Sequence, residues 1–260
     1  MRISLIGAGN LATHLGLALN EKNHQIIQVF SKSEEHASDL GSRLNCPFCN
    51  DLSEIVPDAD LYIIAVKDFA IKSVLESVDF GDHLVVHTSG SVPSSVFSNH
   101  CKNYGVLYPL QTFSKEKAVD FNGIPILIEA NNAENIAILK NLASEISEKV
   151  IPLKSGQRLS VHLSAVFACN FVNHFYYIAE QLLRDQQLDF KLLKPIILET
   201  ALKAVNNSPR LVQTGPAVRN EKLVMEEHLK MLSLYPEWER IYELISENIY
   251  NTHKTQNDIF

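Results

Sequence analysis

The sequence predicts an α/β protein, in which a doubly wound, mostly parallel sheet is followed by an all-helical C-terminal region. Three observations lead to this fold class. Short apolar segments alternate with helical segments over the first half of the chain, and a glycine-rich turn joins the first such pair. After Lys154 the strand-like patterns disappear. We therefore expect one domain over residues 1–153 and a helical domain over 154–260.

The expected strands are short apolar runs. Residues 60–66 are almost continuously apolar, which is typical of a parallel strand that is covered on both faces. The full set of expected strands is 2–6, 25–30, 60–66, 83–87, 105–108, 125–129 and 150–153. The helices expected between them are 10–22, 34–44, 68–78 and 133–147, each with apolar residues recurring on one face.

The C-terminal region reads as helices joined by polar turns. We expect helices at 159–184, 192–207, 220–232 and 237–250. The first would have about 26 residues, which is longer than a typical surface helix. A segment rich in turn formers, Asn206 to Pro209, separates the second helix from the third.

Composition and charge exclude several classes of function. Hydrophobic residues make up 46% of the chain and charged residues 20%, as in ordinary soluble proteins. The formal net charge is −7, and no basic run is present, so neither nucleic acid nor an anionic membrane surface is an expected partner. No apolar run approaches the roughly 18 residues of a membrane span. We expect a cytoplasmic protein.

Cys46 and Cys49 have the spacing of a redox or zinc motif. A zinc site would need a second pair of ligands, whereas Cys101 and Cys169 are isolated. A redox pair would begin a helix, whereas this one follows a helix. We interpret both thiols as small apolar side chains in an edge strand and expect no metal site.

The turn at residues 7–12 indicates dinucleotide binding. Its sequence is Gly7-Ala8-Gly9-Asn10-Leu11-Ala12, and it follows a strand and opens a helix. Gly7 permits the tight turn, Gly9 lets the backbone approach a pyrophosphate, and Ala12 allows close packing of helix on strand. The free N–H groups of the helix N-terminus would bind the phosphates. A tight turn without a ligand is the alternative.

The end of the second strand distinguishes the two nicotinamide cofactors. An NAD enzyme carries an acidic residue there for the ribose 2′-hydroxyl. Ser31, Lys32 and Ser33 stand at this point instead, and they can donate hydrogen bonds to a 2′-phosphate. We therefore predict NADP(H), with NAD less favoured, although Ser33 also suits the start of a helix.

Two further strand ends are expected to border the same crevice. Ala65, Val66 and Lys67 follow one buried strand. Thr88, Ser89 and Gly90 follow the next. The carboxyl ends of parallel strands are where open α/β sheets bind ligands, and small or hydroxyl side chains leave room for the nicotinamide ribose. Either segment is alternatively a simple turn.

Five stretches together resemble a known family. They are 7–12 (GAGNLA), 65–68 (AVKD), 87–91 (HTSGS), 108–113 (YPLQTF) and 214–219 (TGPAVR). The set resembles Rossmann-like proteins with a C-terminal DUF2520 domain, which are described as NADP oxidoreductases or as F420-dependent NADP oxidoreductase-like. A more distant similarity is to ketopantoate reductase, pyrroline-5-carboxylate reductase and 6-phosphogluconate dehydrogenase-like proteins. The resemblance implies a small-molecule substrate and a homodimer formed through the helical domain.

The chain departs from the family pattern at two points. Tyr108 stands where the family often has His, and Arg219-Asn220-Glu221 stands in place of Arg-Gly-Asp. Both replacements keep polar side chains. Tyr108 and Gln111 follow a strand end and are expected near the nicotinamide. Arg219 is a candidate clamp for a substrate carboxylate, with a capping or interdomain salt bridge as the alternative.

A polar stripe on the long helix supplies candidates for catalysis. At 100° per residue, Arg158, His162, Cys169, Asn173 and Tyr176 fall within an arc of about 60°. Such a stripe is either a functional cleft or the wet face of the helix. His162 is the candidate general acid–base because imidazole titrates near neutral pH. By similarity to the distant relatives, Asn170 or Asn173 would orient a substrate carbonyl.

The predicted function is an NADP(H)-dependent oxidoreductase. It would transfer a hydride to or from a small polar substrate, one bearing a carboxylate in the expected case, bound between the domains. The alternative is a non-catalytic dinucleotide-binding or sensing dimer. His14 and His24 have no sequence companions and are expected at the surface.

Overall fold

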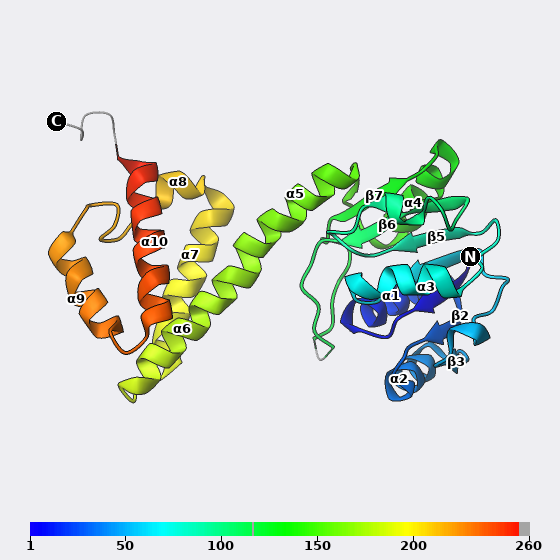
Figure 1. Ribbon diagram of the computed structural model, residues 1–260, viewed down its shortest axis with the longest axis horizontal. Coiled ribbons are helices and arrows are strands. Elements are labelled where there is room, and N and C mark those ends of the chain that lie inside the picture. Colours follow the sequence, from blue (N-terminus) through cyan, green and yellow to red (C-terminus); the bar gives the residue numbers. More distant parts are fainter. Residues whose placement is uncertain (116, 255–260) are drawn as a thin grey trace. The chain divides into compact units, whose positions relative to one another are not determined.

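The structure is a computed structural model that describes residues 1–115 and 117–254. The chain divides into two compact units, Met1–Ala168 and Cys169–Phe260 (Figure 1). Strands give way to helices where the sequence predicts, between the last strand at Val150–Pro152 and a helix that begins at Ser155. The first unit nevertheless continues through that helix.

The first unit is built on one sheet, coloured blue to green in Figure 1. Its strands are β1 Arg2–Ile6, β2 Gln25–Phe30, β3 Phe48–Cys49, β4 Leu61–Ile64, β5 Leu84–His87, β6 Asn103–Pro109, β7 Ile126–Ala130 and β8 Val150–Pro152. The strand order is β3-β2-β1-β4-β5-β6-β7-β8. All neighbouring pairs are parallel except β6 and β7, which run antiparallel. The predicted doubly wound, mostly parallel sheet is confirmed.

Helices cover both faces of this sheet. They are α1 Asn10–Glu21, α2 Glu34–Leu44, α3 Ile71–Ser77 and α4 Ala133–Ile146. A further helix, α5 Ser155–Ala165, follows β8. Alternate residues of β4 divide between two cores: Leu61 and Ile63 pack with residues of α1, α2 and α4, whereas Tyr62 and Ile64 pack with residues of α3. This explains the continuous apolar run, since a strand that is covered on both faces has no solvent side.

The edge strand β3 contains one of the paired cysteines, in agreement with our interpretation of that motif. Cys49 is buried and Cys46 partly buried, and both are free thiols. Burial raises the pKa of Cys46 to about 11. Burial, with the carboxylates of Glu54 and Asp51, does the same for Cys49. Thiols that stay protonated at neutral pH are poor nucleophiles and metal ligands.

The second unit consists of helices, coloured yellow to red in Figure 1. They are α6 Val172–Asp185, α7 Lys194–Asn206, α8 Pro209–Val212, α9 Lys222–Leu232 and α10 Pro236–His253. The short helix α8 lies in the segment after Pro209 that the sequence analysis leaves without a helix. None of the helices in the described residues has the length and apolar character needed to cross a membrane.

The predicted single helix over 159–184 is wrong in two respects. The helix begins earlier, at Ser155, and a π-helical segment, Val166–Phe171, separates α5 from α6. A π-helical turn contains more residues than an α-helical turn, so side chains beyond it lose the 100° register. The predicted stripe from Arg158 through His162 to Cys169, Asn173 and Tyr176 therefore does not continue past Ala165.

Candidate functional site

The glycine-rich turn leaves space where a pyrophosphate would lie. Gly7 has a φ of +127°, and a Cβ there would lie 2.4 Å from the carbonyl oxygen of Ala65. Gly9 is the N-cap of α1, and a Cβ built on it meets nothing within 4 Å. No side chain caps the first N–H groups of α1, and its first turn contains no acidic residue. This open, uncapped helix end fits an anionic group.

The segment after β2 is held by its own hydroxyls. The Ser33 N–H donates to Ser31 Oγ at 3.3 Å, and Ser33 Oγ caps α2 by accepting from the His36 N–H at 3.4 Å. Lys32 is exposed. The structure confirms that Ser33 starts a helix. No carboxylate lies at the end of β2, and the contact of this segment with a 2′-phosphate stays a prediction.

The ends of β4 and β5 are joined by side chains. Ser91 Oγ donates to the Asp68 carboxylate. Ser89 Oγ accepts from the N–H groups of Ser91 at 3.1 Å and Val92 at 3.0 Å. The Thr88 N–H donates to the carbonyl oxygen of Ile64 at 3.2 Å. Asp68 and Ser91 extend the predicted set at these strand ends, and both follow directly the residues singled out from the sequence.

Tyr108 and His162 meet over Gly90. Tyr108 is the penultimate residue of β6, and His162 lies on α5. The tyrosine hydroxyl and His162 Nδ1 share a hydrogen bond of 3.2 Å, with the ring centroids 6.1 Å apart. A Cβ on Gly90 would lie 2.6 Å from that Nδ1 and 2.8 Å from Tyr108 Cζ. Three residues predicted for the site from separate segments thus contact one another.

The electrostatics of this cluster favour a protonated tyrosine. Burial raises the pKa of Tyr108, and the carboxylate of Asp68 raises it further, while the charge of Arg158 opposes both. A phenol whose pKa is raised keeps its proton throughout the neutral range. Tyr108 is therefore a hydrogen-bond donor at the carboxyl end of β6, next to the His162 ring.

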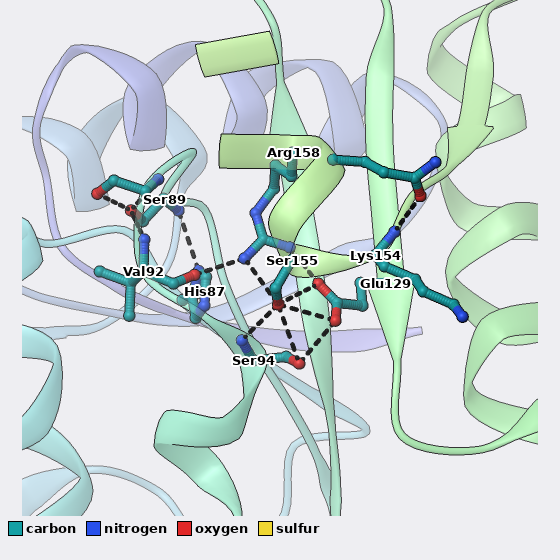
Figure 2. A network of polar contacts seen from close by, with 10 residues as sticks. His87, Ser89, Val92, Ser94, Glu129, Lys154, Ser155 and Arg158 are labelled. Carbon is teal, nitrogen blue, oxygen red and sulfur yellow. Dashed lines mark hydrogen bonds and ion pairs between the residues drawn. The ribbon is translucent and has the colours of Figure 1, made fainter. Parts of the chain in front are cut away.

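The sequence analysis did not predict the ion pair between Arg158 and Glu129, which Figure 2 shows with its polar neighbours. Arg158, on α5, is 1% exposed and donates to the Glu129 carboxylate on β7 and to the carbonyl oxygen of Val92. Ser94 Oγ donates to the same carboxylate at 2.8 Å, and Ser155 Oγ does so at 2.8 and 2.9 Å. An acidic residue in a buried strand was the available sequence signal.

His87, the last residue of β5, is also buried. Its Nδ1 accepts the Ser89 N–H at 3.1 Å, and its ring stacks on Phe97 with the centroids 5.4 Å apart. Burial lowers the pKa of His87 to about 4, and the charge of Arg158 adds to this, against the carboxylates of Asp68 and Glu129. The ring is neutral at pH 7 and supports the turn that contains Gly90.

Four other predicted residues have contacts or exposure of their own. Gln111 is exposed, and its Oε1 accepts the N–H of Thr112 at 2.9 Å. Arg219, in the helical unit, forms a two-point ion pair with Glu221 at 2.7 and 3.0 Å. Asn170 and Asn173 are exposed in the helical unit. The roles of these four residues stay predictions.

His14 and His24 are buried, contrary to expectation. His14 hydrogen-bonds the carbonyl oxygen of Ser114 at 2.9 Å, and its ring stacks on Phe113. Asn10 donates to the Phe113 carbonyl at 2.8 Å. The segment after β6 is therefore fastened to α1 immediately beside the glycine-rich turn.

The helical unit has a cavity of about 360 Å³ that is almost wholly apolar. Its lining carries no charged side chain, and its polar groups are the hydroxyls of Thr214, Tyr242 and Ser246 and the indole N–H of Trp238. Across the described residues, no group of three or more His, Cys, Asp or Glu side chains is arranged to hold a metal ion.

Comparisons with known proteins show the family to which the chain belongs. Residues 2–90 match the family described as NADP oxidoreductase, coenzyme F420-dependent, and residues 124–249 match the domain of unknown function DUF2520. No match was found among curated proteins. A solved structure from Bacteroides fragilis, provisionally named an NADP oxidoreductase, is 45% identical, with 96% of this chain and 98% of that chain covered and a TM-score of 0.92.

Two more distant structures share the fold. An imine reductase from Myxococcus stipitatus, solved with NADP+, is 12% identical with a TM-score of 0.68, over 96% of this chain and 92% of that chain. A pyrroline-5-carboxylate reductase from Streptococcus pyogenes is 13% identical with a TM-score of 0.62, over 96% and 98%. The predicted distant similarity to pyrroline-5-carboxylate reductase is confirmed as a similarity of fold. From the whole-chain match and the two adjoining domains, the chain belongs to the NADP oxidoreductase family with a C-terminal DUF2520 domain, and it is an NADP-dependent oxidoreductase.

Proposed function

We propose that this oxidoreductase reduces or oxidises a small polar substrate at the carboxyl ends of β5 and β6, with His162 as a general acid–base that acts through the Tyr108 hydroxyl. The observation that carries this is the hydrogen bond between Tyr108 and His162, closed over a glycine that has no room for a side chain. Hydride transfer requires a group that delivers or removes a proton at the substrate oxygen or nitrogen. Tyr108 and His162 together would deliver or remove this proton.

The cofactor would be held by residues of the first unit. The turn from Gly7 to Ala12 and the N-terminus of α1 would bind the pyrophosphate, and Ser31, Lys32 and Ser33 would receive the 2′-phosphate. The segments 65–67 and 88–90 would border the nicotinamide ribose. When bound, the reduced nicotinamide supplies the hydride.

The protein's own residues then manage the proton. The Tyr108 hydroxyl donates a hydrogen bond to the substrate heteroatom, which polarises the carbon that is to be reduced. His162, hydrogen-bonded to that hydroxyl, replaces the proton that the tyrosine gives up. In oxidation the same path runs backward. In this scheme Asn170 and Asn173 orient the substrate carbonyl, and Gln111 and Arg219 contact its polar groups.

Turnover tests the catalytic assignment. NADPH oxidation is followed with a panel of small aldehydes, ketones, keto acids and imines, for the wild type and for His162→Gln and Tyr108→Phe. Loss of a general acid–base group lowers the rate by roughly 10²- to 10⁴-fold. We expect both variants to bind NADPH as the wild type does but to lose turnover by that factor. Full turnover in His162→Gln would refute the assignment.

Cofactor affinity tests the residues after β2. Fluorescence titration of the wild type should give a lower Kd for NADPH than for NADH. Ser31→Asp places a carboxylate where the 2′-phosphate would lie, so it should weaken NADPH binding by tenfold or more and leave NADH binding unchanged or improved. Ser73→Asp, on the exposed side of α3, is the matched control. Equal loss of both cofactors in Ser31→Asp would contradict this placement.

We also propose a homodimer formed through the helical unit. Its helices expose large apolar side chains to a degree unusual for a monomer. On α7, Ile196 is 62% exposed, Leu198 60% and Val205 81%, and Leu211 on α8 is 83% exposed. A second copy of the chain would bury these side chains, in keeping with the similarity noted from the sequence.

A further inference from the structure

We propose that the buried Glu129–Arg158 pair is a positioning device, which sets His162 at the correct distance from Tyr108 by fastening α5 to the loop that contains Gly90. The proposal goes beyond the function proposed above, because it concerns two residues that need not touch substrate or cofactor. It gives Glu129 and Arg158 the role of holding Tyr108 and His162 at hydrogen-bonding distance.

Arg158 is the anchor of α5. It is the one fully buried residue of this helix, whereas Leu159 and Leu163 beside it are 49% and 56% exposed. Apolar packing therefore contributes little to fixing α5 within the first unit. A buried guanidinium is costly unless its charge is paired, so the partners of its two terminal nitrogens define where the helix must lie. The third nitrogen, Nε, is buried without a hydrogen-bond partner among the described residues.

The partners of Arg158 come from both sides of the cluster. Its guanidinium donates to Glu129 on β7 and to the carbonyl oxygen of Val92, two residues beyond Gly90 (Figure 2). The same Glu129 carboxylate accepts from Ser94, at the end of that loop, and from Ser155, the first residue of α5. One carboxylate thus fixes the loop, the helix start and the arginine together.

The position of His162 follows from that of Arg158 by helical geometry. Residues four apart lie on the same face of an α-helix, one turn from each other, and His162 is four residues beyond Arg158. Arg158 sets the height of α5 above the sheet, and through Val92 it also holds the loop against which the His162 ring rests. A shift of either segment changes the 3.2 Å contact between Tyr108 and His162.

The alternative is that the Glu129–Arg158 pair only stabilises the fold, and this alternative predicts a different result. A pair that only stabilises the fold would lower the unfolding temperature when removed and would leave the His162 ring unchanged in the protein that remains folded. A positioning pair alters the ring environment even where the fold is intact. The readout therefore has to be local to His162 and independent of turnover.

The experiment uses ¹⁵N-histidine-labelled full-length protein, with the ring signals of His162 assigned by comparison with His162→Gln. Tyr108→Phe defines the signal of an imidazole that has lost its partner. The test variants are Glu129→Gln, Arg158→Lys and the double variant Glu129→Leu/Arg158→Met, since replacing a whole buried ion pair by apolar residues is often tolerated. Lys102→Met, which removes an exposed ion pair with Asp82 in the same unit, is the matched control.

We expect the test variants to move the His162 ring signals toward those of Tyr108→Phe while the Kd for NADPH stays within about twofold of the wild type. With a substrate in hand, kcat should fall by 10- to 100-fold at unchanged KM for NADPH, as displacements of about 1 Å can produce. Arg158→Lys retains the positive charge, so the result can be taken from this variant if the other test variants fail to fold.

Two outcomes would overturn the proposal. One is a folded double variant or Arg158→Lys protein with wild-type His162 signals, and the other is a loss of NADPH affinity that parallels the signal change. Failure of the proposed function looks different. In that case His162→Gln keeps full turnover, while the ring signals of His162 still report whether the ion pair positions the ring.

Discussion

Gly90 is the residue on which the contact between the two rings depends. A methyl group there would lie 2.6 Å from His162 Nδ1, closer than real Cβ atoms approach, so Gly90→Ala must push the imidazole or the tyrosine aside. We expect the hydrogen bond to be lost, turnover to fall by tenfold or more, and stability to drop by about 1–3 kcal/mol from overpacking. The kinetics of NADPH oxidation and a thermal melt measure these effects.

Gly123→Ala is the control for this substitution. Nothing lies within 4 Å of a Cβ at Gly123, so the added methyl should change neither turnover nor the melt appreciably. If Gly90→Ala behaves like Gly123→Ala, the rings can separate at no cost, and the contact has no role in catalysis.

The lowered pKa of His87 predicts that the protein becomes less stable as the pH falls below 6.5. Its folded pKa of about 4 lies below the ordinary value of 6.5, so the unfolded chain binds the proton first. Stability contributed by the neutral ring is complete above pH 6.5 and is lost as the pH falls from 6.5 toward 4. At 1.36 kcal/mol for each unit, the loss is on the order of 3 kcal/mol.

His87→Asn tests this effect. Asparagine keeps an acceptor for the Ser89 N–H but does not titrate, so urea unfolding between pH 4 and 7 should show a shallower fall in the free energy of unfolding than in the wild type. The variant is less stable at pH 7, because a smaller side chain packs on Phe97. Parallel pH curves for the two proteins would show that another group is responsible.

Sequence reasoning finds candidate side chains where each has its own local signal. Gly7 and Gly9 belong to a fingerprint with a physical cause at each position, and Tyr108, Gly90 and His162 each follow an interpretable pattern. The Glu129–Arg158 pair escaped, because its members are 29 residues apart and only the sheet order brings β7 beside the start of α5. No local pattern encodes such a meeting.

At the level of elements, the two glycines of the turn between β1 and α1 differ in their surroundings, so substitutions at them should have different effects. Gly7→Ala places a methyl 2.4 Å from a backbone oxygen at a φ of +127°, so it should impair folding as well as cofactor binding. Gly9→Ala has an ordinary φ of −79° and open space, so it should fold normally. It should nevertheless weaken NADPH binding, because the methyl occupies the approach of the pyrophosphate.

Circular dichroism and NADPH titration distinguish the two variants. The expected pattern is a destabilised Gly7→Ala protein and a stable Gly9→Ala protein with a Kd raised by tenfold or more. A Gly9→Ala protein with wild-type affinity would mean that the cofactor does not approach this turn closely.

The long helix shows where periodicity stops being a guide. A uniform 100° step aligned His162 with Asn173, but the π-helical segment Val166–Phe171 interrupts that step. Nothing in the composition of this segment distinguishes it from an α-helix. The strands were easier to predict, because β4 and β5 each consist of residues that are buried on both faces, and such apolar runs are bounded by clear turn signals.

For the whole molecule, the exposed apolar surface of the helical unit leads to the last prediction. Burial of apolar surface contributes about 25 cal/mol for each Å². Burying several such side chains therefore favours a dimer and offsets the free-energy cost of association. Size-exclusion chromatography with light scattering should give twice the chain mass of 29.2 kDa at micromolar concentration. Val205→Arg, which charges a side chain that is 81% exposed on α7, should shift this toward the monomer.

Phe69→Arg provides the matched control, since Phe69 is 83% exposed in the first unit. It should leave the mass at the dimer value. A wild-type protein that elutes at 29.2 kDa over the whole concentration range would contradict the dimer. A dimer that is lost in Phe69→Arg and kept in Val205→Arg would instead place the interface on the sheet unit, because a buried arginine without a partner is tolerated only away from the contact.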